Sequence, residues 1–248
     1  MSRYIPKSID KEVKTASGFR CAWCGVYLTE RHHIIPYNLT KSHDKDSLIL
    51  LCPTCHAEAD AERITADELI KRRIQLSGEV DRSSGNLSIN SDLLKVNVGG
   101  NSFINCNNIL VFNDIPLISV QNKNGYLLVS LKLFNREGNL ICWMNENRWW
   151  VENQAILDFK YSKNNLSVFE NKNDKILDLT IKDDLVEVCG LIHLLGDNIQ
   201  LSKDKIIFKN SQNQFISNTF SNINNAIVIK EKSFTGPIFG NCGILFII

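Results

Sequence analysis

The sequence predicts an α+β protein in which a small N-terminal domain, residues 1–82, precedes an all-β domain, residues 83–248. Two observations on composition mark this division. Both closely spaced cysteine pairs and four of the five histidines lie in the first part, whereas 27 of the 28 asparagines lie after residue 85. The polar segment GEVDRSSGN, residues 78–86, contains glycine and serine and predicts a linker or turn between the domains.

Two helices are expected in the N-terminal domain. The first covers residues 8–16. The second begins where Thr65 and Glu68 have the spacing of a capping box, in which the two side chains satisfy backbone amides at the start of a helix. Leu69, Ile70 and Ile74 follow and are expected on one face of that helix.

Short runs of β-branched and aromatic residues fill the C-terminal domain and alternate with polar turn sequences. The runs are YLLVSLKLF, LICWM, AILDFKYS, KILDLTI, DLVEVCGLIHLL, DKIIFKN and NAIVIKE. The first two flank Glu137 and Gly138 and predict a hairpin. We therefore expect a mostly antiparallel assembly, either a sandwich or a barrel-like roll. A β-solenoid is the second expectation, because GGNSFINCNNILVFND and FGNCGILFII resemble each other.

The net charge of +1 argues against tight nonspecific binding of DNA through overall basicity, although it leaves room for a local basic surface. The N-terminal segment MSRYIPKSIDKEVK lacks the apolar core of a secretory signal, and no stretch approaches the roughly 18 apolar residues that cross a bilayer. We expect a cytoplasmic protein with no membrane contact. Disulfides are disfavoured in that compartment. The isolated cysteines are then expected to be small buried apolar residues: Cys106, Cys142, Cys189 and Cys242.

Two C-x2-C pairs lie in the N-terminal domain. Cys21 and Cys24 form the first pair, Cys52 and Cys55 form the second, and 27 residues separate the two pairs. Two such pairs can place four thiolates in a tetrahedron around one Zn2+. The alternatives are four unrelated buried thiols or two disulfides. The spacing favours zinc, and a site closed by four sulfurs is structural, since it leaves no position for a substrate.

The segment RHHIIP, residues 31–36, lies between the two pairs, and His56 directly follows the second pair. On a strand, His32 and His33 would point to opposite faces. On a helix, Asp60 would share a face with His56. His32, His56 and Asp60 are therefore candidate ligands of a catalytic metal ion, with His33 left as a general base. Taken alone, each histidine could instead be a hydrogen-bonded structural residue, and Asp60 could be a solvated carboxylate on a helix.

The combined pattern of C-x2-C, HHIIP and LILLC-x2-CH resembles the HNH endonuclease family, in its four-cysteine zinc-containing branch, over about residues 18–62. The resemblance implies a ββα-metal unit, in which a two-stranded ribbon and a helix surround one divalent ion. It implies that His33 is the general base that activates water and that His32 and His56 are metal ligands. Asp60 lies where some members carry a further ligand.

The chain departs from the family pattern at one position. The family usually has an asparagine before the LILLC strand, where this chain has Ser47. That asparagine is thought to hold the loop and orient the base histidine, so Ser47 is the candidate for this task, with one hydroxyl in place of a two-headed amide. Asp46 and Asn38 are the alternatives to it. His43 is expected on a surface loop.

The implied reaction is hydrolysis of a DNA phosphodiester by in-line attack of water, with His33 taking the proton and the metal ion stabilising charge. Mg2+ or Mn2+ is the expected catalytic ion, while Ni2+, Co2+ or Zn2+ also suits a site with two imidazoles. An ordinary solvated helix face is the alternative for the basic run at residues 71–73. Basic side chains expected to contact neighbouring phosphates are Arg20, Arg31, Lys71, Arg72 and Arg73.

The C-terminal domain has 15 basic and 15 acidic residues after residue 85, so it lacks the charge of a major DNA-binding surface. We expect it to sense, target or oligomerise, through a second copy of the chain or a protein partner. Trp143, Trp149 and Trp150 are interpreted first as packing residues and second as an anchor for a partner. The apolar tail GILFII is expected to be a buried strand or part of a subunit interface.

Three functions follow from these patterns. The first is a metal-dependent HNH endonuclease of DNA, which family analogy alone extends to bacterial defence against phage or plasmids. The second is a non-catalytic zinc module that binds nucleic acid or protein. The missing asparagine favours this second function, and the second set of metal-binding residues opposes it. In the third, the β domain is the main interaction module and the nuclease is silent until triggered.

Overall fold

The computed structural model describes residues 4–76, 81–91, 93–172, 174–183, 185–194, 198–210, 213–231 and 242–247. Its contacts divide the chain into two compact units. The first unit combines Met1–Ser83 with Glu152–Ser162, and the second combines Ser84–Val151 with Lys163–Ile248. The linker expected at residues 78–86 is wrong in part. Residues 78–80 lie outside the described chain, and residues 82–86 form a strand rather than a turn.

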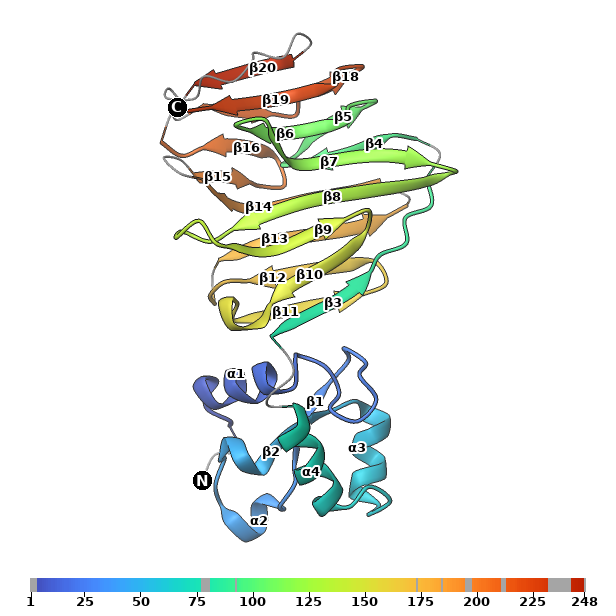
Figure 1. Ribbon diagram of the computed structural model, residues 1–248, viewed down its shortest axis with the longest axis vertical. Coiled ribbons are helices and arrows are strands. Elements are labelled where there is room, and N and C mark those ends of the chain that lie inside the picture. Colours follow the sequence, from blue (N-terminus) through green and yellow to red (C-terminus); the bar gives the residue numbers. More distant parts are fainter. Residues whose placement is uncertain are drawn as a thin grey trace. The chain divides into compact units, whose positions relative to one another are not determined.

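The first unit is built from short helices around a two-stranded antiparallel ribbon (Figure 1). The two strands of the ribbon are β1 and β2. The elements are α1 (Lys7–Ala16), β1 (Glu30–His33), α2 (Tyr37–Thr40), the 3-10 helix η1 (Lys45–Ser47), β2 (Leu48–Leu51), α3 (Pro53–Asp60), α4 (Ala66–Leu76), the 3-10 helix η2 (Asn153–Ala155) and β11 (Asp158–Ser162).

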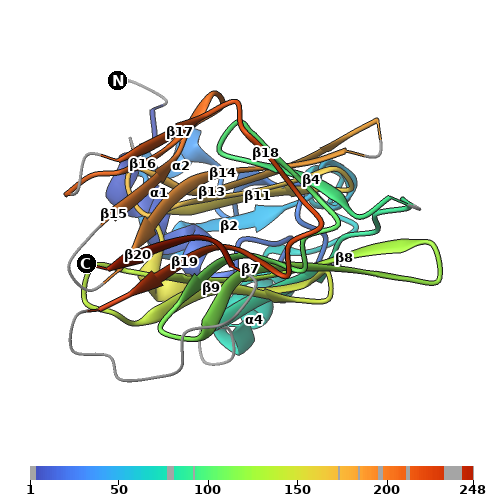
Figure 2. The same ribbon diagram turned by 90° about the horizontal axis from the view of Figure 1, so that it is seen from above.

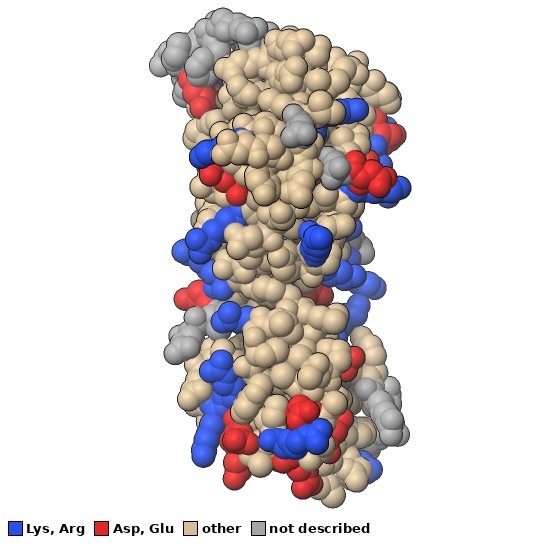
Figure 3. Space-filling model, turned by 90° about the vertical axis from the view of Figure 1, so that its right-hand side faces the viewer, with Lys and Arg blue, Asp and Glu red and all other residues tan. Residues whose placement is uncertain are grey.

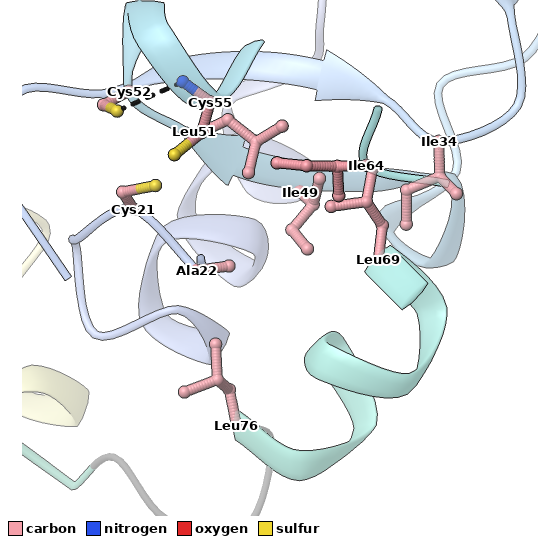
Figure 4. Close-up of a cluster of buried hydrophobic side chains, with 10 residues drawn as sticks. All are labelled: Cys21, Ala22, Ile34, Ile49, Leu51, Cys52, Cys55, Ile64, Leu69 and Leu76. Carbon is pink, nitrogen blue, oxygen red and sulfur yellow. Dashed lines mark hydrogen bonds between the residues drawn. The ribbon is translucent and has the colours of Figure 1, made fainter. Parts of the chain in front are cut away.

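Strand β2 is the centre of this unit because all four of its residues are buried. Leu48 and Leu50 cluster with Val13 of α1 on one face of the ribbon. Ile49 and Leu51 belong to a second cluster on the other face, which Figure 4 shows in close-up. A strand covered on both faces is a continuous apolar run, which explains the sequence LILL.

Helix α4 begins at the predicted capping box. The Thr65 amide donates to Glu68 Oε2 at 2.8 Å, and the Glu68 amide donates to Thr65 Oγ1 at 3.3 Å. The expected apolar face is wrong, because Ile70 and Ile74 are 36% and 63% exposed. Leu69 and Leu76, two turns apart, are the buried pair, and both belong to the apolar cluster of the first unit.

The segment Glu152–Ser162 belongs to the first unit although it follows that unit by about 70 residues in sequence. Lys14 of α1 binds the Asp158 carboxylate at 2.6 Å. The Phe159 ring lies 5.0 Å from the ring of Phe19 and 5.3 Å from that of Tyr27. The sequence predicts the strand here but not that its contacts lie with the N-terminal residues.

The second unit consists of strands arranged in two sheets (Figure 1). One sheet has the order β20-β19-β6-β7-β8-β9-β10-β3, and the other runs β12-β13-β14-β15-β16-β17 with β4, β5 and β18 attached. The strands are β3 (Arg82–Asn86), β4 (Lys95–Val98), β5 (Asn101–Ile104), β6 (Asn108–Phe112), β7 (Ile115–Lys123), β8 (Tyr126–Phe134), β9 (Leu140–Asn145), β10 (Arg148–Glu152), β12 (Asn165–Phe169), β13 (Lys175–Lys182), β14 (Leu185–His193), β15 (Asn198–Leu201), β16 (Lys205–Phe208), β17 (Gln214–Ile216), β18 (Thr219–Ser221), β19 (Asn225–Lys230) and β20 (Cys242–Ile247).

Figure 2 shows the two sheets as two layers. Strand β8 buries Leu127, Val129, Leu131 and Leu133 and turns the intervening residues outward, which is the alternation of a sheet with one covered face. The expected β-rich C-terminal part is therefore confirmed, and within the described strands neither sheet closes into a barrel. The predicted hairpin is also present, because β8 and β9 pair antiparallel around a turn in which Gly138 has a φ of +82°.

An in-register parallel stack lies inside this sandwich. Strand β5 pairs in parallel with β18, and β6 pairs in parallel with β19, which pairs in turn with β20. The partners in the first two pairs are 117 residues apart throughout, so Phe103 stacks on Phe220 with ring centres 4.9 Å apart. The two segments whose resemblance suggested a solenoid include β6 and β20, which flank β19 on either side and both run parallel to it. Residues 239–241 of the second segment lie outside the described chain.

Asparagines form a ladder along this stack. Asn108 Nδ2 donates to Asn225 Oδ1 at 2.8 Å, and Asn107 Nδ2 donates to Asn224 Oδ1 at 3.2 Å. Asparagine meets asparagine because the parallel register places the two residues next to each other. Each side-chain amide can both donate and accept a hydrogen bond, so two such amides can pair. This ladder explains in part why the chain is rich in asparagine after residue 85.

The tryptophans and cysteines divide by burial. Trp149 is fully buried, which agrees with packing, whereas Trp143 and Trp150 are half-buried and stack on each other at 5.7 Å. Cys106 and Cys142 are buried free thiols, and burial raises the pKa of Cys142 to about 12. Cys189 is half-buried, and nothing is described of the side chain of Cys242.

The apolar tail forms strand β20, which pairs in parallel with β19, as the strand prediction requires. A role of this strand in a subunit interface stays a prediction. Figure 3 shows basic and acidic side chains interspersed on one face of the molecule, in keeping with the near-neutral charge. In the described part of the chain, no helix combines the length and the apolar character needed to cross a bilayer.

We expect Asn225→Ala to lower the free energy of unfolding of the second unit by about 1–2 kcal/mol, because it leaves the Asn108 amide without its partner in a buried place. The matched control is Asn224→Ala on the exposed rung, which should cost less than about 0.5 kcal/mol. Urea unfolding followed by tryptophan fluorescence measures both variants. Equal losses at the two rungs would contradict a role of burial in this ladder.

Candidate metal centres and catalytic site

Four thiols gather beside the small core of the first unit: Cys21, Cys24, Cys52 and Cys55. Their sulfur atoms all lie within 4.8 Å of one another, and the Cys24 and Cys52 sulfurs are 3.6 Å apart. Sulfurs bound tetrahedrally at about 2.3 Å from a zinc ion lie about 3.8 Å from one another. The thiols therefore fit Zn2+ with little rearrangement.

Local turns place these thiols. The amide of Cys24 donates to Cys21 Sγ at 3.5 Å, and the amide of Cys55 donates to Cys52 Sγ at 3.4 Å. Gly25 closes the first turn with a φ of +82°, a conformation in which a side chain is strained. Cys52 caps α3, so its sulfur also faces the positive end of that helix.

The acidity of the thiols agrees with a cation site. Burial opposes ionisation of Cys52, but hydrogen bonds from the Cys55 amide and from the neighbouring thiols lower the pKa of Cys52 to about 7. Burial and the adjacent sulfurs raise the pKa of Cys55. One thiolate thus forms readily, whereas several together need a bound cation to balance their charge. Figure 4 shows Cys21, Cys52 and Cys55 at one end of the apolar cluster that contains Ile34 and Leu69.

The pairing of β1 with β2 separates the two adjacent histidines. His32 lies opposite Ile49 and His33 lies opposite Leu48. Residues directly opposite in a ladder share a face of the sheet, so the two imidazoles point to opposite sides, as the sequence predicts. His32 is 9% exposed on the side of the cysteine cluster, and His33 is half-buried on the side of α1.

His32, His56 and Asp60 come together as the sequence predicts. The Asp60 carboxylate lies 3.3 Å from His56 Nδ1, one turn earlier on α3, and 3.6 Å from His32 Nδ1. The three potential ligand atoms lie within 4.8 Å of one another, and Asp60 is 60% exposed. Two imidazoles and one carboxylate that open to solvent fit a divalent cation with coordination positions left for a substrate.

Electrostatics favours the neutral form of His32. Burial, and then the neighbouring His56, lowers the pKa of His32, while the Asp60 carboxylate opposes that shift. Neutral imidazole is the form that binds a metal ion. A pocket of about 720 Å³ spans this site and is bordered by His32, His33, His56 and Asp60. Because acidic residues also border it, attraction of a phosphate there depends on a bound cation.

Two of the arginines that were expected to contact phosphates bind other parts of the protein. Arg31 borders the pocket, and its guanidinium binds the Asp10 carboxylate of α1 in a two-pronged pair at 2.6 and 2.9 Å. Arg72 Nε donates to the carbonyl oxygen of Ala22 at 2.8 Å, beside the first cysteine pair. Both guanidinium groups therefore already have partners in the fold, and phosphate contact by Arg31 and Arg72 stays a prediction.

The other basic residues differ in exposure. Arg73 binds the Asp46 carboxylate at 3.0 Å and the Lys45 carbonyl oxygen at 3.1 Å, which ties α4 to the loop before β2. Lys71 is exposed on α4, and Arg20 is half-buried. Lys71 therefore has the solvent access that phosphate contact requires, and its role also stays a prediction.

Ser47 is not brought to the base histidine. Its hydroxyl donates to the Asp44 carbonyl oxygen at 2.8 Å, and its own carbonyl oxygen accepts from the Ile34 amide at 2.8 Å. Among the residues that the structure describes, Ser47 makes no hydrogen bond to His33. Asn38, one suggested substitute, is exposed on α2.

A residue that the sequence interpretation set aside contacts the base histidine instead. His43 Nδ1 lies 3.2 Å from His33 Nε2, and the ring of Tyr37 stacks on His43 at 4.6 Å and 16°. The expectation that His43 lies on a surface loop is wrong in part, because the residue does lie in a loop but is half-buried against two rings. The available signal was a third histidine only ten residues after His33, between two short helices. Burial, and then His43, lowers the pKa of His33.

Comparison with known proteins agrees with this geometry. A family model described as HNH endonuclease matches residues 19–62, which contain both sets of potential metal ligands. Anaredoxin from Nostoc sp. strain PCC 7120 is 32% identical over 57 residues, which cover 22% of this chain and 75% of that protein. No solved structure matches the chain significantly.

The ribbon, helix α3 and the cysteine cluster all fall within the matched residues. The remaining residues form mostly β-strands. Through residues 19–62, this chain belongs to the HNH endonuclease family, and it joins that domain to a β-rich C-terminal part.

Proposed function

We propose that this protein is a metal-dependent endonuclease that hydrolyses DNA phosphodiester bonds at the pocket beside β1. The single observation that carries the proposal is the division of the histidine pair. His32 joins His56 and Asp60 in one donor set, while His33 borders the same pocket from the other side of the ribbon. A group that binds a cation and a group that takes a proton are thus held next to each other.

In this proposal His33 is the general base, and it takes the proton of the attacking water. A divalent cation held by His32, His56 and Asp60 would supply charge stabilisation at the phosphate and at the leaving oxygen. Arg31 at the pocket border and the exposed Lys71 on α4 would contact neighbouring phosphates of the DNA. Mg2+ or Mn2+ suits the carboxylate, and softer ions such as Ni2+, Co2+ and Zn2+ suit the imidazoles.

The four cysteines would hold a structural zinc ion. They join the loop before β1 to the start of α3, so they fix the spacing between the strand that carries His32 and the helix that carries His56. A unit with so small an apolar core depends on such a crosslink for its stability.

A second candidate is a zinc module that binds nucleic acid or protein without catalysis. The observation that favours it is the Ser47 hydroxyl, which is directed to Asp44 and not to His33. The donor set of His32, His56 and Asp60 favours the nuclease, because a binding module needs no second metal site. Family analogy further extends the nuclease proposal to defence against phage or plasmid DNA, with the β-rich unit sensing, targeting or oligomerising.

We expect His33→Ala to lower the rate of plasmid nicking by about 10²- to 10⁴-fold, because it removes the proton acceptor. Nicking is measured on supercoiled plasmid with Mg2+ or Mn2+, and on matched single-stranded DNA and RNA. The matched control is Leu39→Ala, an exposed change on the following helix that should leave the rate within about 2-fold. Undiminished nicking by His33→Ala would overturn its assignment as the base.

We expect that a substitution at one metal site will weaken metal binding there and leave the other site unchanged. Cys24→Ser should lose one equivalent of zinc and unfold at a lower temperature, because it opens the tetrahedral site. His56→Ala should keep that zinc and weaken Mn2+ binding at the second site at least 10-fold. Elemental analysis counts the zinc, and calorimetric titration measures Mn2+ binding.

The control for Cys24→Ser is Cys189→Ser, which removes a half-buried thiol outside the cluster and should keep the zinc content unchanged. If the wild-type protein holds one zinc ion and does not bind Mn2+, the non-catalytic zinc module is the better description. Loss of zinc in His56→Ala would contradict two independent sites.

A further inference from the structure

We propose that His43 is a positioning residue of the catalytic site: its imidazole holds the ring of His33 through Nε2, which leaves His33 Nδ1 to take the proton of water. The inference rests on the proposed function, in which His33 is the general base. It assigns to His43 the task that the sequence interpretation gave to Ser47.

The contact between the two imidazoles carries the inference. His33 Nε2 and His43 Nδ1 are 3.2 Å apart, within hydrogen-bond distance. A neutral imidazole has one N–H donor and one acceptor nitrogen. When His33 donates from Nε2 to His43, its Nδ1 keeps the lone pair. The proposal assigns the proton of this contact to His33 Nε2, which leaves His33 Nδ1 as the nitrogen that accepts a proton, as a general base requires.

The surroundings of His43 hold its ring in place. Tyr37 stacks on it at 4.6 Å with an angle of 16° between the rings, and the Tyr37 ring also lies 5.6 Å from His33. After His43, the loop is fixed at Asp44, whose carboxylate accepts from the Asp46 amide and whose carbonyl oxygen accepts from Ser47. A side chain restrained by stacking and by its loop can orient a neighbour with little loss of conformational entropy.

A second observation separates this role from ordinary packing. His43 Nε2 is buried and has no hydrogen-bond partner within the described chain. A buried polar atom in that state costs about 1–3 kcal/mol of stability. A phenylalanine would keep the stack on Tyr37 without that cost. The buried Nε2 thus lowers stability, whereas the contact with His33 requires the ring nitrogen Nδ1.

The test compares His43→Phe with His43→Asn. The first keeps an aromatic ring against Tyr37 and removes Nδ1, and the second places an amide group close to where Nδ1 was. We expect His43→Phe to lower kcat for plasmid nicking about 10- to 100-fold, with KM for DNA and Mn2+ affinity unchanged. His43→Asn is expected to recover most of that loss. The melting temperature of His43→Phe should equal or exceed that of the wild type.

A double variant shows whether His43 acts through His33. If it does, His33→Ala with His43→Phe should be no slower than His33→Ala alone, because two residues that act as a unit are not additive. A further loss in the double variant would overturn the inference. So would wild-type kcat in His43→Phe, or an equal loss in both His43 variants together with a lower melting temperature.

These outcomes remain distinct from failure of the proposed function. If wild-type protein nicks DNA and His33→Ala does not, the nuclease proposal stands, and the His43 variants alone decide the positioning role. If His33→Ala nicks DNA at the wild-type rate, the general base lies elsewhere, and the inference about His43 is overturned with it.

Discussion

The register between β1 and β2 is the constraint on which the candidate site depends. His32 lies opposite Ile49 and His33 lies opposite Leu48, so one histidine turns toward the metal-binding side and the other away from it. A slip of one residue would exchange the two roles, because side chains alternate along a strand. The buried run Leu48–Leu51 prevents that slip, since its two apolar faces pack against different clusters.

Much of the metal-binding arrangement could be predicted from the sequence, because it depends on short-range geometry. C-x2-C spacing, alternation on a strand and the four-residue period of a helix bring together the cysteines and the set of His32, His56 and Asp60. The partner of His33 could not be predicted this way. It depends on the path of an irregular loop, and no periodic rule places His43 or turns Ser47 toward Asp44.

The same distinction applies to the second unit. Runs such as residues 126–134 carry a clear alternation and are strands with the expected bounds. Strand β6 pairs with β19 although their paired residues are 117 positions apart in the sequence. In this pairing the side-chain amide of Asn108 donates a hydrogen bond to that of Asn225. Contacts of that sequence separation depend on the whole packing of the two layers, and local pattern carries little information about them.

The discontinuous first unit has a consequence for how the chain could be divided or recombined. Residues 84–151 are an insertion in its connectivity, since residues 152–162 return to complete its packing around Lys14 and Phe19. A fragment ending at residue 82 would lack Asp158 and Phe159 and leave apolar surface uncovered. Exchange of the β-rich part for another module would require three joints in the chain rather than one, because the chain passes between the two units at residues 83/84, 151/152 and 162/163.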